Sequence, residues 1–173
     1  MEPTHSALFL RFSANKLAQL SGRIADTVIR LPEEQVWLRQ HETNNAVGNL
    51  ILHLGGNVRQ WILSGIGGNP DIRIRDAEFS ARGEVETKEL LSRLQSTVDE
   101  AVMLLRSLPE ERLGEQIVVQ KYQLTILEAI YHVVEHFAQH TGQILFAAKL
   151  LTRESLGFYG HLSGVVPRKD PTP

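Results

Sequence analysis

Apolar residues recur every three to four positions in four stretches of this chain, and the segments between them hold most of the proline and glycine. A spacing of three to four residues places apolar side chains on one face of a helix. We therefore expect amphipathic helices over about residues 6–30, 45–63, 86–107 and 125–151.

Local residues indicate where these helices begin and end. Pro32 and Pro109 follow the first and third stretches, and proline interrupts a helix. Asn44-Asn45 are favourable N-cap residues for the second stretch. Thr125 and Glu128 have the spacing of a capping box, in which each side chain satisfies a free backbone N–H at the start of the fourth helix.

The connection between the second and third helices spans about twenty residues, whereas adjacent antiparallel helices are usually joined by two to eight. We expect a long crossover there. The sequence thus predicts an all-α four-helix bundle, formed by one domain over residues 1–173, with an irregular tail at residues 152–173.

Composition narrows the possible functions. The chain has no cysteine, so a metal site must use nitrogen and oxygen ligands. The net charge of −2 arises from scattered residues, which argues against nucleic acid as a partner. The N-terminus lacks the features of a signal peptide, and no apolar run approaches the length of a membrane span. We expect a cytoplasmic protein that does not bind membranes.

Three histidines in the fourth stretch, His132, His136 and His140, are spaced four residues apart. Side chains four apart lie one turn from each other on a helix, and two such imidazoles can share a metal ion. On a helical wheel His136 and His140 fall at the edge of the buried face and inside it, while His132 lies further toward the polar side. We therefore take His136 and His140 as ligands.

The second stretch contributes His53, beside its own apolar face. An imidazole directed at a core needs partners for its nitrogens, and a metal site would satisfy one of them. His53, His136 and His140 would form a three-nitrogen site with an open position, suited to Zn²⁺ or Ni²⁺. Asn57 and Gln143, each one turn beyond a ligand, and His132 could hydrogen-bond a ligand or line the pocket.

Two simpler interpretations stay open. A lone histidine is more often a core or surface residue than a ligand, although four in this arrangement favour a metal. Arg73, with other arginines, could attract an anionic substrate, but scattered arginines are usually solvated.

The segment from His136 to Ile144 resembles the closing His-x3-His-x-Gly-Gln-Ile signature of the DinB-like superfamily of metal-binding four-helix bundles. The segment Asn49 to Asn57 is similar to the second helix of that superfamily, and Arg73 to Phe79 resembles an uncharacterised bacterial subgroup. The resemblance implies up-down-down-up wiring, a three-histidine site at His53, His136 and His140, and a homodimer.

Some members of the superfamily are thiol transferases, so the resemblance also suggests a metal-dependent enzyme. Its partners would be a small-molecule substrate and a low-molecular-weight thiol. A hydrolase is a related possibility, and the sequence identifies no catalytic residue. The alternative is a non-catalytic protein that binds or senses a metal or small molecule in a stress response, or one in which the metal only stabilises the bundle.

Overall fold

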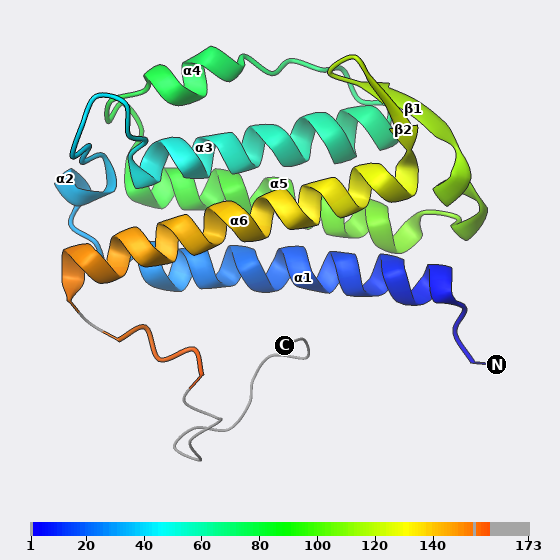
Figure 1. Ribbon diagram of the computed structural model, residues 1–173, viewed down its shortest axis with the longest axis horizontal. Helices are drawn as coiled ribbons and strands as arrows, with labels where there is room; N and C mark the ends of the chain where they lie inside the picture. The colour runs from blue at the N-terminus through cyan, green and yellow to red at the C-terminus, as the bar shows by residue number, and fades with distance from the viewer. Residues whose placement is uncertain (1, 154, 160–173) are drawn as a thin grey trace.

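The computed structural model describes residues 2–153 and 155–159. Four long helical segments form the body of the molecule, as predicted for an all-α protein (Figure 1). They are α1 (His5–Val28), α3 (Val47–Val58) with the π-helix η1 (Arg59–Ile66) that continues it, α5 (Thr87–Ser107) and α6 (Ile126–Thr152). The shorter elements are α2 (Glu33–Val36), α4 (Arg75–Ser80), the 3-10 helix η2 (Glu110–Gly114) and the strands β1 (Gln116–Val119) and β2 (Tyr122–Thr125).

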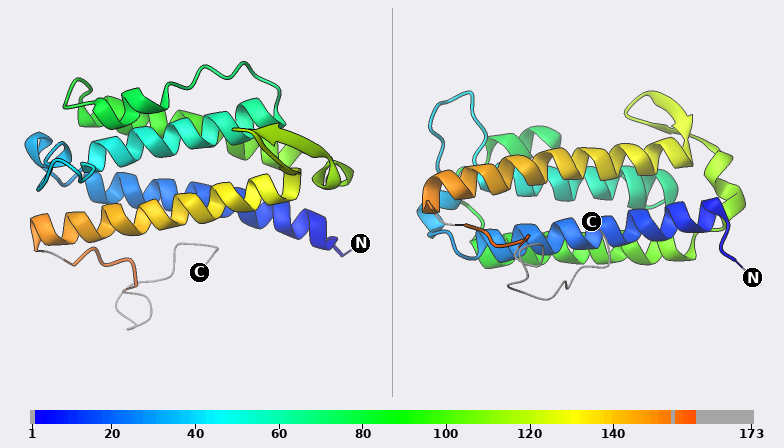
Figure 2. Two further views of the ribbon diagram at one scale, coloured as in Figure 1. Left: turned by 45° about the horizontal axis from the view of Figure 1, so that its top comes forward. Right: turned by 60° about the horizontal axis from the view of Figure 1, so that its bottom comes forward.

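The long helices lie along a common direction, with α1 and α3 each packed between α5 and α6 (Figure 2). Their apolar faces meet in one continuous core. Burial of this surface is the main force that holds the helices together. The core includes the fully buried side chains of Leu17, Ile24, Leu54, Val98, Ile130 and Phe137.

The helix boundaries agree with the predictions at α6 and differ at α3. Thr125 and Glu128 form the expected capping box, in which Glu128 Oε2 accepts from the Thr125 N–H at 2.7 Å. The prediction that Asn44-Asn45 cap the next helix was wrong, because α3 begins at Val47. The Asn49 side chain caps the start of α3 instead, because its Oδ1 accepts a hydrogen bond from the Ala46 N–H at 3.1 Å.

The second long helical segment also continues past its predicted end at residue 63. The π-helix η1 carries it to Ile66, passing through the glycine at position 65. Ile62, Leu63 and Ile66 are all buried there, so apolar packing outweighs the low helix propensity of glycine.

The chain between η1 and α5 returns along the outside of the bundle, through α4, so that α3 and α5 run in the same direction (Figure 1). Short helix α4 lies against α3. This segment therefore covers the outer face of α3.

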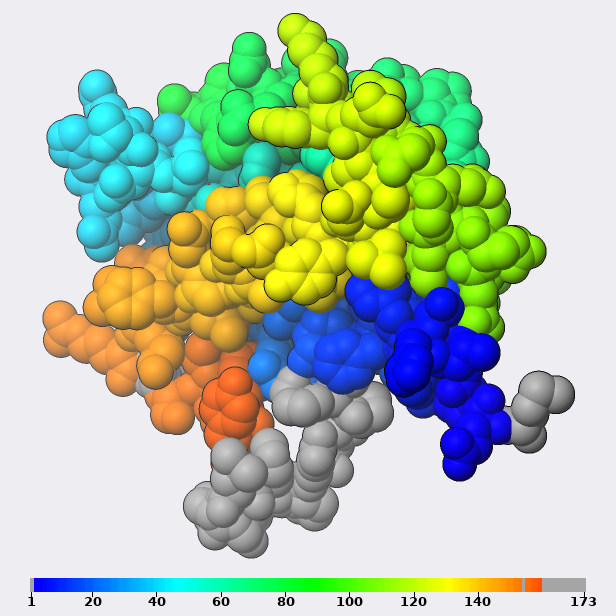
Figure 3. Space-filling model, turned by 45° about the vertical axis from the view of Figure 1, so that its right-hand side comes forward, coloured from blue at the N-terminus to red at the C-terminus, as the bar shows by residue number. Residues whose placement is uncertain are grey.

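The hairpin β1–β2 was not predicted. Its strands pair antiparallel, with Val119 opposite Tyr122. The two turn residues, Gln120 and Lys121, have φ of 51° and 71°. Such a turn usually contains Asn-Gly or Asp-Gly, and that signal is missing here. The hairpin (yellow-green) projects at the start of α6, and β1 lies against η1 (Figure 3).

Most of the predicted irregular tail at 152–173 lies outside the described residues. Within them, Thr152 is still helical, and the Phe158 and Tyr159 rings each lie 5.5 Å from the Arg23 guanidinium on α1. In the described ranges, no helix combines the length and apolarity needed to cross a lipid bilayer.

Candidate metal centre

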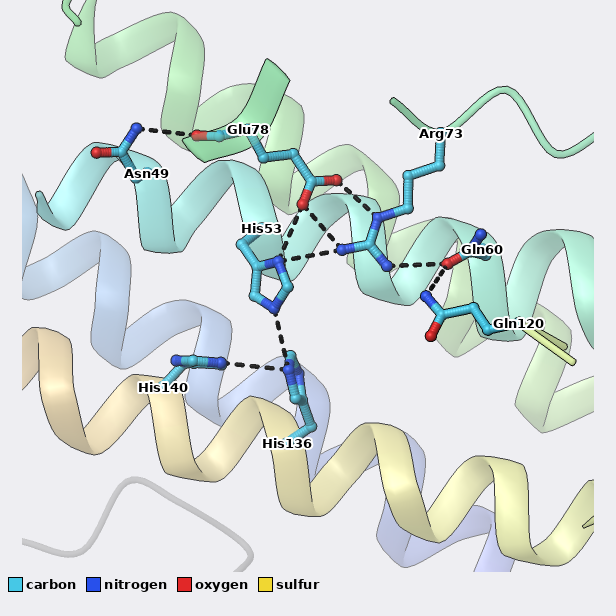
Figure 4. A network of polar contacts seen from close by, with 8 residues as sticks. All are labelled: Asn49, His53, Gln60, Arg73, Glu78, Gln120, His136 and His140. Carbon is cyan, nitrogen blue, oxygen red and sulfur yellow. Dashed lines mark hydrogen bonds and ion pairs between the residues drawn. The ribbon is translucent and has the colours of Figure 1, made fainter. Parts of the chain in front are cut away.

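Neighbouring helices α3 and α6 carry the histidines of the site. His53 projects from α3 and is buried, with 6% of its surface exposed. His136 and His140 project from successive turns of α6 and are half-buried. The antiparallel packing of α3 against α6 brings the three side chains together, although the two helices are far apart in the sequence (Figure 4).

The three imidazoles converge through their Nε2 atoms. His53 Nε2 lies 3.1 Å from His136 Nε2, and His140 Nε2 lies 3.2 Å from the same atom. One nitrogen from each residue lies within 4.8 Å of the others, a grouping that could hold a metal ion.

In His53 and His140, the contact made by Nδ1 determines which ring nitrogen carries hydrogen. His53 Nδ1 lies 2.9 Å from Glu78 Oε2, and His140 Nδ1 lies 2.8 Å from Gln143 Oε1. Both oxygens are acceptors, so both Nδ1 atoms carry hydrogen and both Nε2 atoms present lone pairs. His136 Nε2 can donate one hydrogen to only one of them. At least one of the close Nε2 contacts therefore has no hydrogen bond between its nitrogens, and a shared cation would stabilise the lone pairs that converge there.

Two of the three nitrogen separations fit a transition-metal ion. Bonds of about 2.0–2.1 Å hold two nitrogens about 3.3 Å apart at a tetrahedral angle and about 2.9 Å apart at a right angle. The observed separations of 3.1 and 3.2 Å fall between these values. Imidazole nitrogen is a favoured donor for zinc, nickel and copper, so the donor set fits the same group of ions.

Burial favours the neutral form of His136 and His140, which is the form that binds a metal ion. Burial, reinforced by the charges that neighbouring His140, His53, His132 and Arg73 can carry, lowers the pKa of His136 to about 3. Burial also lowers the pKa of His140, although its hydrogen bond with Gln143 acts in the opposite direction. His136 is therefore a neutral imidazole at any physiological pH.

Glu78 is a member of the site that the sequence did not reveal. It lies on α4 and is buried, with 8% of its surface exposed. Burial acts to raise the pKa of its carboxyl, but hydrogen bonds from Arg73 and His53 and the Arg73 charge outweigh burial, and the pKa lies below its ordinary value. An ionised carboxylate behind a histidine orients the ring and increases its basicity toward a metal.

Of the other residues predicted for the site, Gln143, His132 and Asn57, only Gln143 hydrogen-bonds one of the three histidines among the described residues. Gln143 contacts His140 directly. His132 lies between the Trp61 ring, at 4.5 Å, and the His136 ring, at 5.6 Å, and it is outside the converging group. Burial lowers the pKa of His132, with Glu135 acting in the opposite direction. Asn57 is buried, and its Oδ1 has no hydrogen-bond partner among the described residues.

A surface hollow of about 370 Å³ adjoins the site through Gln143. It lies between the first turns of α3 and the last turns of α6, with residues of the loop before α3 along its rim. No side chain that lines it carries a formal charge. Its walls consist of Leu38, Gln40, Thr43, Asn44, Asn45, Val47, Leu50, Gln143, Phe146, Ala147, Leu150 and Leu151.

Comparison with known proteins gives a family match without a function. A family model described as "Protein of unknown function (DUF1572)" matches residues 4–160. This family is part of the DinB-like fold group. No curated protein matches the chain significantly.

Two solved structures have the same fold. A conserved protein from Enterococcus faecalis superposes with a TM-score of 0.71 at 14% identity, over 83% of this chain and 97% of the other. A DinB-like protein (YjoA) from Bacillus subtilis superposes with a TM-score of 0.60 at 17% identity, over 90% of this chain and 98% of the other. At these identities the likeness shows the fold alone, which is DinB-like as the sequence indicated.

Proposed function

Because the chain belongs to the DUF1572 family and has a DinB-like fold, we propose that it binds one divalent metal ion, Zn²⁺ or Ni²⁺, through His53, His136 and His140 and uses it in a reaction of a small molecule. The observation that carries this proposal is the convergence of three Nε2 atoms, two of which present lone pairs to the same point. Without a cation, that arrangement is electrostatically unfavourable.

The proposed reaction is transfer of a low-molecular-weight thiol to a small electrophile. When bound, the ion supplies Lewis acidity that lowers the pKa of a coordinated thiol or water. The thiol must come from a cosubstrate, because the chain contains no cysteine. The uncharged hollow beside Gln143 offers space for a small molecule next to His140.

The chain's own residues provide orientation rather than proton transfer in this proposal. Glu78 and Gln143 hold the Nδ1 sides of His53 and His140, so the Nε2 lone pairs face a common point. His136 contributes a ligand that remains neutral well below pH 7.

Metal content tests the first part of the proposal. We expect elemental mass spectrometry to find about one Zn²⁺ or Ni²⁺ per chain in wild-type protein purified without an affinity-metal step. His53→Ala and His136→Ala should lose this ion. His41→Ala is the matched control, because the His41 side chain is exposed and, among the described residues, hydrogen-bonds only with Thr43. A wild-type protein that is empty and takes up no added ion would contradict the proposal.

Consumption of free thiol tests the second part. Metal-loaded wild-type protein, mixed with a low-molecular-weight thiol and an alkylating electrophile, should consume thiol faster than the His136→Ala variant. A protein that holds its metal but consumes no thiol would favour the alternative, a non-catalytic protein that binds or senses a metal ion or a small molecule.

A further inference from the structure

An ion pair between Arg73 and Glu78 covers the outer side of His53 (Figure 4). Arg73 Nε lies 2.7 Å from Glu78 Oε1, and Arg73 Nη2 lies 2.8 Å from Glu78 Oε2. The two parallel contacts fix the plane of the carboxylate. Both side chains are buried, with 3% of the Arg73 side chain and 10% of the Glu78 side chain exposed.

The pair determines which nitrogen of His53 carries hydrogen. Arg73 Nη2 also lies 3.1 Å from His53 Nδ1, and a guanidinium can only donate. Nδ1 can either donate to Glu78 or accept from Arg73. Accepting from Arg73 would leave the Nδ1 lone pair facing the Glu78 oxygen at 2.9 Å. Donating to Glu78 avoids that repulsion, since Arg73 Nη2 already has Glu78 Oε2 as its acceptor.

Further contacts prevent the guanidinium from turning away. Arg73 Nη1 donates to Gln60 Oε1 at 2.9 Å, and Gln60 Nε2 donates to Asp71 Oδ2 at 2.7 Å. Gln120, at the tip of the hairpin β1–β2, donates to the same Gln60 oxygen (Figure 4). The positive φ of Gln120 is an unfavourable conformation for a residue other than glycine, so the tip is held in place at some energetic expense.

Gly56 leaves the space that the pair occupies on α3. A Cβ at this position would lie 1.9 Å from Glu78 Oε1 and 2.9 Å from Arg73 Nε. Its neighbour Gly55 is different, because a Cβ there would meet only Leu94 Cδ1, at an ordinary 3.9 Å. A glycine inside a helix lowers its stability, so close approach of the carboxylate gives a physical reason for Gly56.

We propose that Glu78, fixed by Arg73 and accommodated by Gly56, is a positioning residue that keeps His53 in its Nδ1–H form and directs Nε2 to the metal. The role of this pair rests on the proposed metal binding. The pair also adds no net charge beside the ion. The crossover segment therefore completes the site through a residue that does not touch the metal.

Three variants separate positioning from stability. Gly56→Ala displaces the carboxylate without changing any atom of the pair, and Gly55→Ala is its matched control on the same helix. The double variant Arg73→Met/Glu78→Leu replaces the pair with apolar side chains of similar size, a change that often preserves stability. Circular dichroism and urea unfolding establish that each variant is folded.

The first measurement uses metal-free protein labelled with ¹⁵N in its histidines. One-bond and long-range proton–nitrogen spectra show which nitrogen of His53 carries hydrogen. We expect the Nδ1–H form in wild type and Gly55→Ala, and a mixture or the Nε2–H form in Gly56→Ala and the double variant. An Nε2–H form in wild type, or an Nδ1–H form in all four proteins, would overturn the proposal.

The second measurement is Zn²⁺ affinity by competition with a chromophoric chelator. Loss of a carboxylate behind a metal-binding histidine weakens metal affinity by about 10- to 100-fold, and we expect this for Gly56→Ala and the double variant but not for Gly55→Ala. Equal affinities in all four would overturn the positioning role while metal binding stands. Absence of Zn²⁺ binding in wild type would overturn the proposed function, and with it the proposed role toward a metal, even if the ¹⁵N spectra show that Glu78 sets the His53 tautomer.

Discussion

Acidification should lower the free energy of unfolding of the metal-free protein, because the pKa of His136 differs between the folded and unfolded chain. Burial, together with neighbouring charged groups, lowers the pKa of His136 in the folded protein to about 3, against an ordinary value of 6.5. Below pH 6.5 the unfolded chain takes up a proton at this residue and the folded protein does not. The stabilising contribution is therefore complete above pH 6.5 and is lost as the pH falls from 6.5 toward 3.

The size of the effect follows from the width of that window. Each pH unit in which only the unfolded chain binds the proton removes about 1.4 kcal/mol. Between pH 6.5 and pH 5 this amounts to about 2 kcal/mol. His136 is only half-buried, and solvent screening reduces the value, so we expect a loss of about 1–2 kcal/mol at pH 5.

Urea unfolding in the presence of a chelator, at pH 7.5 and pH 5.0, measures this loss. The matched comparison is His136→Gln, which keeps a polar side chain but cannot titrate. The free energy of unfolding of wild type should fall between the two pH values by about 1–2 kcal/mol more than that of the variant. An equal fall in both proteins would refute the reasoning and would mean that His136 takes up its proton in the folded state as readily as in the unfolded chain.

Three further predictions concern the scaffold. Phe137→Ala removes a fully buried ring and should lower the free energy of unfolding by about 3–5 kcal/mol in urea, whereas a loss below about 1 kcal/mol would show that the core closes around the gap. Gly48→Ala places a Cβ 2.8 Å from the Trp37 ring, whose Nε1 donates to the Val85 carbonyl. It should cost about 1–3 kcal/mol and shift tryptophan fluorescence, and unchanged emission would contradict the displacement. Thr125→Ala breaks the capping box of α6 and should lower the free energy of unfolding by about 1 kcal/mol in thermal unfolding. An unchanged melting temperature would contradict this prediction.

The long helices could be predicted because each buries one apolar face, and apolar residues recur every three to four positions along that face. The hairpin β1–β2 could not, because its turn uses Gln120 and Lys121 rather than glycine or asparagine. Short helix α4 was also missed, since its position depends on its packing against α3. Its six residues, Arg75–Ser80, are too few to form a helical pattern in the sequence.

Within the site, the three histidines could be found because two are one helical turn apart and the third interrupts an apolar face. Glu78 and Arg73 could not be found this way, because their place depends on how the crossover segment lies over α3. Arg73 was considered as a solvated residue, whereas its side chain is buried in the ion pair. Gly56 was the available signal, as a glycine within a helix, three residues after His53, that leaves room for a close neighbour.

The distance of 83 positions between His53 and His136 matters while the chain is being synthesised. When α3 leaves the ribosome, only one imidazole of the site, that of His53, has been made, and alone it is no better a ligand than any other histidine of the nascent chain. The site appears only after α6 has been made and has folded against α3. Uptake of the proposed metal ion would therefore be a late event in the biogenesis of this protein, because it requires that α3 and α6 have packed together.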